Sequence, residues 1–402
     1  MIKRTIFSYF TFEIIRFFLQ FFIAIIIFKK LSISDYANFA IIQSLSAILA
    51  VFLTLNLKSS MQKTYSREGL KEYINFFYSI SIPILIITIL LLIKVFAFIL
   101  QDNLNDSLSV NVSIDLLLFY SVSIALNSAI LSFYNANKRT LFFNLSSLGY
   151  PLIATIFLVI NSEYSLSKLL TLLSFAYLSP LLFILPNLKF KSSGLRISRL
   201  ISIAKYSLNY SIPSFPASGS KLFLEYLARI SIMAGVGEVA VAALAIVNTI
   251  FSVFRSIERS FFRAVTPYLI QVQSSIQDIK LTNKLVKIQT IMTLTFFIFT
   301  FVWLPAVKGF FPEKPDEVFQ YELFLLMSVI YVISLWKNYN MAFLKKRYSD
   351  IRYFFRTTTV FNFVAAFFIF YLVDLPEEYL SILIIANSLN LLVIVKKRRS
   401  LS

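Results

Sequence analysis

The amino-acid sequence predicts an all-α polytopic membrane protein, with about twelve transmembrane helices arranged as two six-helix lobes. Of the 402 residues, 58% are hydrophobic and only 14% are charged, and the mean hydropathy is +0.77. A water-soluble core does not require so large an apolar share, and the apolar runs are long enough to cross a bilayer. The fold class follows from these runs, from the distribution of charge between them and from an internal repeat.

Apolar runs of about twenty residues, separated by short polar loops, give the number of spans. The first run is interrupted by Glu13 and Arg16, and no small-residue cleavage site follows it. We therefore expect a first transmembrane helix rather than a cleaved signal peptide. The linker after the sixth run is basic, and its pattern from Leu195 predicts a short amphipathic helix at the lipid surface. The predicted spans are residues 6–28, 36–57, 75–98, 114–136, 141–160, 167–186, two helices within 205–267, and 285–306, 319–342, 353–373 and 379–395.

Charge is distributed unevenly across the predicted spans. The chain has 38 Lys and Arg against 20 Asp and Glu, a formal net charge of +18. Most basic residues fall in loops on one side, together with both termini, and most acidic residues fall in loops on the other side. This asymmetry follows the positive-inside rule, so we expect both termini in the cytoplasm. It explains the excess of positive charge without a nucleic-acid partner.

The chain contains neither cysteine nor histidine. Disulfides, thiol nucleophiles, imidazole bases and metal sites built from Cys and His are therefore excluded. We expect no metal site and no cofactor. Coupling to protons would have to use carboxylates, and sodium is the other candidate coupling ion.

The two halves of the chain resemble each other around two acidic residues. Asp35 and Glu238 are offset by about 203 residues, and each opens a long apolar run that returns toward the cytoplasm. An even number of spans separates them, so the halves form a parallel repeat related by a pseudo-two-fold axis along the membrane normal. We place the N-terminal six-helix lobe at residues 1–195 and the C-terminal six-helix lobe at 196–402.

The stretch 205–267 concentrates charge where a membrane protein should have little. It reads as two long apolar helices joined by the short turn 235–237, and both carry charges at i, i+4 and i+8, on one helix face. A cation at the centre of a bilayer costs about 2.5–3.5 kcal/mol, so these residues must face a wet cavity, a partner charge or an anionic ligand. The charged residues are Lys221, Glu225 and Arg229 on the first helix, and Arg255, Glu258, Arg259 and Arg263 on the second.

The first helix of this pair also contains three residues that weaken helices. Pro213, Pro216 and Gly219 fall within its first turns. Proline removes a backbone donor and kinks a helix, and a bendable helix beside intramembrane charge indicates a substrate site in transporters. We therefore predict that these three residues form the hinge of a gate.

Arg16 is a further candidate, because it lies at the centre of the first span, where its side chain cannot reach the lipid surface. Glu13 lies one turn earlier, so a structural ion pair is an alternative to a role in a cavity. We predict Glu13 and Glu225 as the ion-coupling residues. The predicted substrate-binding residues are Arg16, Lys221, Arg229, Arg255 and Arg259.

Several of these charges have an alternative interpretation. Glu225 precedes Arg229 by four residues, which is the favourable order for a self-neutralised pair on one helix. Lys94, Lys337 and Arg356 lie toward the ends of their spans, where we expect the side chains to reach the lipid surface instead of a site.

Two stretches at equivalent places in the two halves carry a resemblance to a known family. The first is FKKLSISDYANFAIIQSLSAILAVFLTLNLKSSMQKTYS, and the second is GVGEVAVAALAIVNTIF with the later FFRAVTPYL. The sequence is similar to Wzx-type O-antigen or polysaccharide flippases of the multidrug/oligosaccharidyl-lipid/polysaccharide (MOP) exporter superfamily. That family often has glycine where Ala37 stands. The matching residues are Leu31, Asp35, Tyr36 and Ala37 in the first half, and Gly237, Glu238, Val239 and Pro267 in the second.

The resemblance implies two lobes around a central cationic cavity and transport by alternating access. It implies a multi-pass protein of the bacterial inner (cytoplasmic) membrane that moves undecaprenyl-diphosphate-linked oligosaccharide repeat units from the cytoplasmic to the outer leaflet. These units serve O-antigen or capsule polysaccharide biosynthesis. A monomer in the lipid bilayer is expected, with a polysaccharide polymerase and a chain-length regulator as candidate partners. A lipid diphosphate carries about two negative charges, and basic residues, Arg bidentately, are what such a head group needs.

Three other functions compete with a flippase. A cation-coupled multidrug exporter of the MATE type would need an acidic site for cationic drugs, whereas basic residues predominate within the spans here. A membrane polysaccharide polymerase or ligase usually has a large outer loop with arginines or a histidine, and no such loop is predicted. A membrane scaffold without transport would not explain cations at the bilayer centre.

Overall fold

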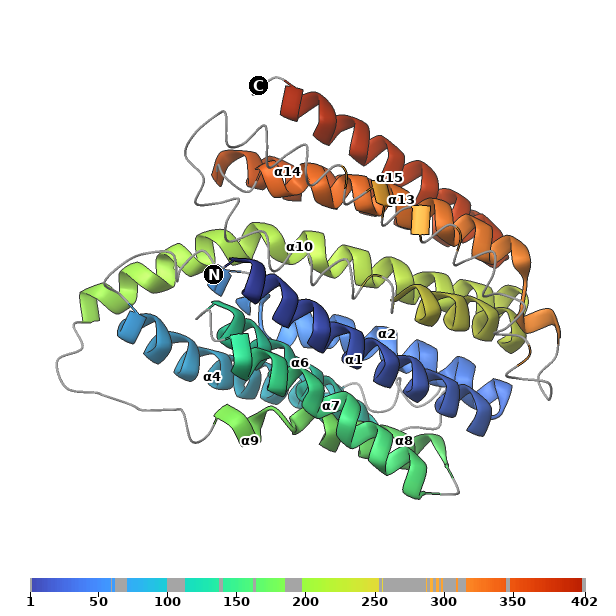
Figure 1. The fold of residues 1–402 in the computed structure, drawn as a ribbon, viewed down its shortest axis with the longest axis horizontal. Coiled ribbons are helices and arrows are strands. Elements are labelled where there is room, and N and C mark those ends of the chain that lie inside the picture. The colour runs from blue at the N-terminus through green and yellow to red at the C-terminus, as the bar shows by residue number, and fades with distance from the viewer. Residues whose placement is uncertain are drawn as a thin grey trace. The chain divides into compact units, whose positions relative to one another are not determined.

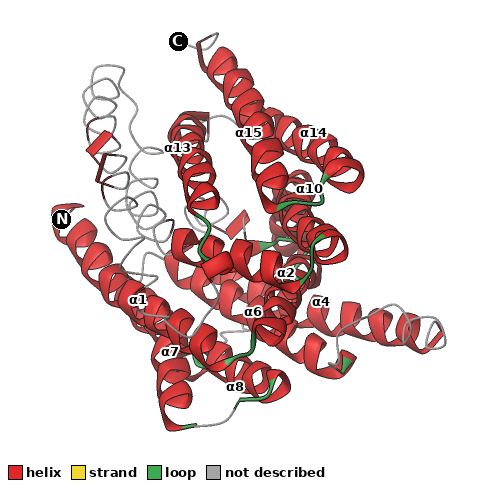
Figure 2. Ribbon diagram, turned by 90° about the vertical axis from the view of Figure 1, so that its right-hand side faces the viewer, coloured by secondary structure: helices red, strands yellow, loops and turns green. Residues whose placement is uncertain are grey.

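The computed structural model describes residues 2–58, 60–61, 71–99, 113–136, 140–161, 164–184, 197–252, 316–344 and 348–399, with isolated positions between 255 and 309. Every regular element in this part of the chain is a helix, and it contains no strand (Figure 2). The all-α prediction is therefore confirmed. The α-helices are α1 (Ile2–Lys30), α2 (Ile33–Leu53), α4 (Lys71–Ile99), α6 (Ile114–Ala136), α7 (Thr140–Ile160), α8 (Leu166–Leu178), α9 (Leu181–Ile184), α10 (Ile197–Gly235), α13 (Tyr321–Leu344), α14 (Tyr348–Leu372) and α15 (Pro376–Arg399), and η2 (Asp316–Val318) is a short 3-10 helix.

Five of the described helices are long and apolar enough to cross a membrane. They coincide with predicted spans, and so do three shorter apolar helices, Ile80–Lys94, Leu166–Leu178 and Glu238–Ser252. The predicted span 285–306 lies outside the described residues, except for a few isolated positions. The five helices are Ile33–Leu53, Ile114–Ala136, Leu141–Ile160, Tyr353–Leu372 and Pro376–Lys396.

The chain divides into two compact units. Unit 1 comprises Met1–Ile41 and Leu224–Ser402, and unit 2 comprises Ile42–Phe223. The division falls inside α2 and α10, two helices that are labelled in Figure 1, so each of them contributes to both units. The predicted lobes, divided after residue 195, therefore stay a prediction, because the two units follow packing and do not cut the chain at a single point.

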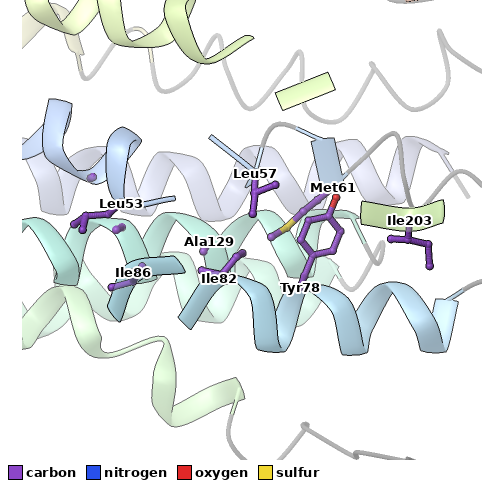
Figure 3. Packing of buried hydrophobic residues seen from close by; sticks show 10 residues of the cluster. Leu53, Leu57, Met61, Tyr78, Ile82, Ile86, Ala129 and Ile203 are labelled. Carbon is purple, nitrogen blue, oxygen red and sulfur yellow. The ribbon is translucent and has the colours of Figure 1, made fainter. Parts of the chain in front are cut away.

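Unit 2 is built around α6, which packs against α4, α7, α8 and α9. Small side chains line the buried side of α6, including Ser121, Ser123 and Ala125, and such residues let membrane helices approach closely. One apolar cluster joins α6 to α4, to the end of α2 and to the start of α10 (Figure 3). Its buried members are Ala50, Leu53, Leu57, Met61, Tyr78, Ile82, Ile86, Ala125, Ala129 and Ile203.

Unit 1 contains the packed helices α13, α14 and α15 and an apolar helix at its interior. This interior helix is Glu238–Ser252, and all of residues 240–247 are buried. Most of these residues are alanine or valine, so the helix can be surrounded on every side. A helix that is apolar all round is typical of a buried position.

The turn between the two helices of the charged stretch is as short as predicted. The backbone N–H groups of Val236 and Gly237 both donate to the carbonyl of Ile232, at 2.9 Å and 3.1 Å, and close the end of α10. Gly237 has a φ of 101°, which a side chain would strain. Glu238 then opens the next helix directly.

The helix α10 differs from the prediction. We expected a separate amphipathic helix from Leu195 and a break near the prolines, but one helix runs from Ile197 to Gly235 through both Pro213 and Pro216. Membrane helices tolerate proline because neighbouring groups satisfy the carbonyls that it frees.

A break occurs instead in α2, where the sequence predicts a continuous span. The helix ends at Leu53, and Leu55 and Asn56 have positive φ values of 42° and 53°. Neither residue is glycine, so this backbone conformation is sterically costly and must be held by its surroundings.

Candidate functional site

Arg229 is the most buried of the cations that the structure describes in the charged stretch. It lies on α10 in unit 1, and only 7% of its surface is exposed. Its Nη1 donates a hydrogen bond to the backbone carbonyl of Ala40 on α2. A guanidinium is a strong donor, and placing it in an apolar interior requires such partners.

Charged and phenolic groups from four segments surround Arg229 within unit 1. Glu225 lies one turn earlier on α10, and Arg255 follows the helix Glu238–Ser252. The phenols come from α2 and α15, and both tyrosines are almost completely buried. We call this group the Arg229 cluster. It consists of Arg229 and the four residues that interact with it electrostatically, Tyr36, Glu225, Arg255 and Tyr379.

Tyr36 connects the Arg229 cluster to the buried helix Glu238–Ser252 and to α1. Its hydroxyl is hydrogen-bonded to Thr249 on the buried helix Glu238–Ser252. Its ring packs edge-on against Phe28, with the centroids 4.8 Å apart. Tyr36 and Ala40 are four residues apart on α2, so the helix presents both groups on one face.

The cluster has the chemistry of an anion-binding site in which a carboxylate offsets part of the positive charge. Among the residues that the structure describes, the cluster holds two guanidinium groups and one carboxylate, so the positive groups outnumber the negative one there. Arg255 is half-buried and Arg229 is engaged by a carbonyl, so Arg255 is the better placed of the two to receive an anionic ligand. A guanidinium can bind the oxygens of a phosphate bidentately.

The structure thus brings together three of the predicted site residues: Glu225, Arg229 and Arg255. Arg16 is buried on α1, with 8% of its surface exposed, as a central position on the first span requires. Lys221 is exposed on α10 and belongs to unit 2. The side chain of Glu13 and all of Arg259 lie outside the described residues.

The predicted hinge residues lie within unbroken helix. Pro213 and Pro216 are internal to α10, and a side chain added at Gly219 would meet nothing within 4 Å. Packing in this region therefore does not require a glycine at position 219. The hinge role of the three residues stays a prediction.

A second polar network, in unit 2, fixes the break in α2. The side-chain amide of Asn56 donates to the hydroxyls of Ser214 and Ser218 on α10, both at 3.1 Å. The hydroxyl of Tyr78 on α4 shares hydrogen bonds with Ser60, at 2.8 Å, and with Ser207 of α10, at 2.9 Å. Both contacts hold the α2 break against the part of α10 that contains the prolines.

The remaining basic residues behave in different ways. Lys94 forms an exposed ion pair with Asp115, at 3.0 Å, which fits the expected surface role. Arg356 is exposed. Lys337 does not simply reach out to lipid, because its Nζ lies 3.4 Å from the amide oxygen of Asn387 and 5.9 Å from the ring centre of Phe354.

Several residues of the site were not predicted from the sequence. Tyr36 entered only as part of the family resemblance, and Tyr379 and Thr249 did not enter at all. Asn56 gave no signal, because its role depends on serines that lie far away in the sequence. The start of α2 could have been located, since Ser32 and Asp35 have the spacing of a helix cap, and the Ser32 hydroxyl does accept from the Asp35 N–H at 3.0 Å.

Comparison with solved structures identifies the fold. A MATE solved in complex with MaL6 superposes with a TM-score of 0.69 at 15% sequence identity, over 99% of this chain and 96% of that chain. An inward-facing multidrug resistance MATE family transporter of the MOP superfamily gives a TM-score of 0.69 at 15% identity, over 95% and 93%. A MOP superfamily transporter from Pyrococcus furiosus, described as having a binding pocket of reverse polarity, gives 0.65 at 16% identity, over 99% and 95%.

No family model and no curated protein matches the sequence. By these superpositions the chain has the fold of MATE-type transporters, which confirms the predicted fold class. At this identity the likeness concerns the fold alone.

Proposed function

We propose that this chain is a flippase that moves undecaprenyl-diphosphate-linked oligosaccharide repeat units from the cytoplasmic to the outer leaflet by alternating access. Membrane transport is supported by the fold, because similar solved structures are named as transporters. The same names support a protein that is not an enzyme. The substrate class is supported by one observation, the Arg229 cluster, whose described residues bring two arginines together with one carboxylate.

An anionic head group explains why this cluster is stable in a membrane. Buried arginines need counter-charge, and Glu225 is the one carboxylate among the described members of the cluster. A diphosphate supplies about two negative charges and accepts paired hydrogen bonds from a guanidinium. Arg255, which is half-buried, is the residue that we assign to first contact with the head group.

A cation-coupled multidrug exporter is the second candidate, because several similar folds carry the MATE name. A site for cationic drugs needs an excess of carboxylates, whereas arginine predominates in the Arg229 cluster. One MOP superfamily transporter with this fold is described as having a binding pocket of reverse polarity, so the polarity of the pocket differs among proteins of this fold. The charge of the cluster therefore favours an anionic substrate.

Protons or sodium are the candidate coupling ions in this proposal, with Glu225 and Glu13 as their carriers. The polysaccharide polymerase and the chain-length regulator are proposed as partners on the strength of the family resemblance alone. The bacterial inner membrane is the proposed location, with both termini in the cytoplasm.

The test is flipping of a fluorescent polyprenyl-diphosphate oligosaccharide by the full chain in proteoliposomes. Arg255→Gln should reduce the rate about 10- to 150-fold, the factor given by losing one charge-assisted hydrogen bond of about 1.5–3 kcal/mol. Arg255→Lys should lose less, because it keeps the charge. Lys94→Ala, which removes an exposed basic residue, is the control and should flip at the parent rate.

The result also separates the two candidate functions. Efflux of a cationic dye without flipping of the lipid-linked oligosaccharide would replace the flippase by the drug exporter. If Arg255→Gln flips the substrate at the parent rate at equal protein content, the Arg229 cluster does not bind the substrate.

A further inference from the structure

We propose that the turns at 31–35 and 235–238 form a clasp that closes the outer end of the transport path and must open in each cycle. The clasp consists of a hydrogen bond between Ser34 and Glu238 and, beneath it, the bond from Arg229 to Ala40. All four residues belong to unit 1. The proposal rests on transport by alternating access and does not depend on the substrate.

The contact between Ser34 and Glu238 joins the starts of two helices. The Ser34 hydroxyl donates to a carboxylate oxygen of Glu238 at 2.7 Å. The positions are fixed locally, since Ser32 accepts from the Asp35 N–H at 3.0 Å and donates to the Asp35 carboxylate at 2.9 Å. On the other side, Gly237 makes the sharp turn that places Glu238.

The two partners come from corresponding turns of the internal repeat. Their separation in the sequence is 204 residues, close to the offset of about 203 residues that relates the two halves. A contact between corresponding turns lies near the pseudo-two-fold axis of such a repeat. When the halves of a transporter rock against each other, contacts of this kind form in one state and break in the other.

A second layer lies beneath the exposed hydrogen bond. Arg229 holds the Ala40 carbonyl, and Tyr36 is hydrogen-bonded to Thr249. Phe28 is completely buried and packs edge-on against Tyr36 and against Phe319, whose ring centre is 6.0 Å away. The clasp therefore has a buried layer of aromatic and charged side chains, and the exposed hydrogen bond between Ser34 and Glu238 lies at its end.

The composition of the clasp suits reversible opening. The bond between Ser34 and Glu238 is exposed, so water can replace either partner at small cost. Arg229 would lose the Ala40 carbonyl, but Glu225 lies one turn away on the same helix and interacts with it already. When the bond to Ala40 breaks, the Arg229 guanidinium therefore still has the Glu225 carboxylate as a counter-charge. This lowers the cost of opening the second layer.

Distance measurement between spin labels tests the clasp without any substrate. The chain has no cysteine, so Lys30→Cys with Val236→Cys, both exposed, introduces the only two thiols beside an intact clasp. In nanodiscs, double electron–electron resonance should give a short and a longer distance, and Glu238→Ala should raise the ratio of long to short about fivefold. Glu377→Ala, another carboxylate at a helix start, should leave that ratio unchanged. Identical distance distributions with Glu238 and Glu238→Ala would overturn the clasp.

Cross-linking then asks whether opening is required for transport. Ser34→Cys with Glu238→Cys, joined by a short bifunctional reagent that attaches to each thiol through a disulfide, should lower the transport rate at least tenfold. Reduction of the two disulfides should restore the rate. The control pair is Lys94→Cys with Asp115→Cys, whose parent side chains also touch, at 3.0 Å, but within the predicted N-terminal lobe. Full transport by the cross-linked Ser34–Glu238 variant would overturn the proposal. If the parent chain flips no lipid-linked oligosaccharide, the proposed function fails, while the spin-label distances still decide the clasp.

Discussion

Arg229 and Lys94 show how burial separates two basic residues that look alike in the sequence. Both lie in apolar runs, yet Arg229 is 7% exposed and bound to a backbone carbonyl, whereas the side chain of Lys94 is 63% exposed and paired with an exposed Asp115. The helical spacing predicts that Glu225 and Arg229 share a face, and they do interact. The carbonyl of Ala40 could not be predicted, because every residue has a carbonyl and only packing selects one.

The contrast leads to a prediction about stability. Arg229→Gln should lower the free energy of unfolding by about 1.5–3 kcal/mol, because it removes a charge-assisted hydrogen bond and leaves Glu225 with less compensation. Lys94→Ala should cost less than about 1 kcal/mol, as exposed ion pairs do. Unfolding titrations of both variants in the same detergent measure the difference. Equal losses would show that Arg229 is not held as the structure indicates.

At the scale of the element, the sequence predicts a continuous α2 and a broken α10, and the structure shows the reverse. Proline predicts a broken α10, but that helix is continuous through Pro213 and Pro216. The helix α2 has no proline or glycine near residue 55, yet it breaks there with two left-handed residues. The reason is tertiary, since the amide of Asn56 is held by Ser214 and Ser218 of α10. Local propensity does not contain this information.

The α2 break predicts an ordered series of substitutions. Asn56→Ala should destabilise the protein most, by about 2–3 kcal/mol, because it loses the amide hydrogen bonds and keeps a side chain in a left-handed conformation. Asn56→Gly loses the same hydrogen bonds but adopts that conformation freely, so its loss should be smaller by about 1 kcal/mol. The free energy of unfolding of both variants gives the order. A glycine variant as unstable as the alanine variant would show that backbone strain at Asn56 has no part in the break.

At the scale of the whole molecule, composition and charge pattern predict the class of protein because the bilayer constrains them directly. The long apolar runs, the absence of strands in the described residues and the MATE-type fold agree with that prediction. The substrate cannot be predicted in the same way from composition and charge pattern, because its binding depends on a few side chains whose neighbours are set by packing. The lobe limits at residues 195 and 196 likewise depend on packing across α2 and α10.

The direction of transport leads to a prediction about its energy source. The substrate must leave the cytoplasm, which is electrically negative, and moving about two negative charges outward gains roughly 4–5 kcal/mol per 100 mV. The described part of the Arg229 cluster has two arginines and one carboxylate, so a bound diphosphate leaves the loaded site negative and its outward step runs with the field. The empty cationic cavity then returns toward the negative side, and that step also runs with the field.

Flipping in proteoliposomes under an imposed potential, without a pH or sodium gradient, measures this drive. The rate should rise when the compartment on the predicted cytoplasmic side is negative and fall when the sign is reversed. Lys94→Ala, which alters only an exposed ion pair, should respond as the parent does. Rates that do not depend on the sign of the potential would exclude an electrical drive. Proton coupling is then a separate question: Glu225→Gln or Glu13→Gln should abolish any pH dependence of flipping, and if both variants keep it, neither carboxylate carries the proton.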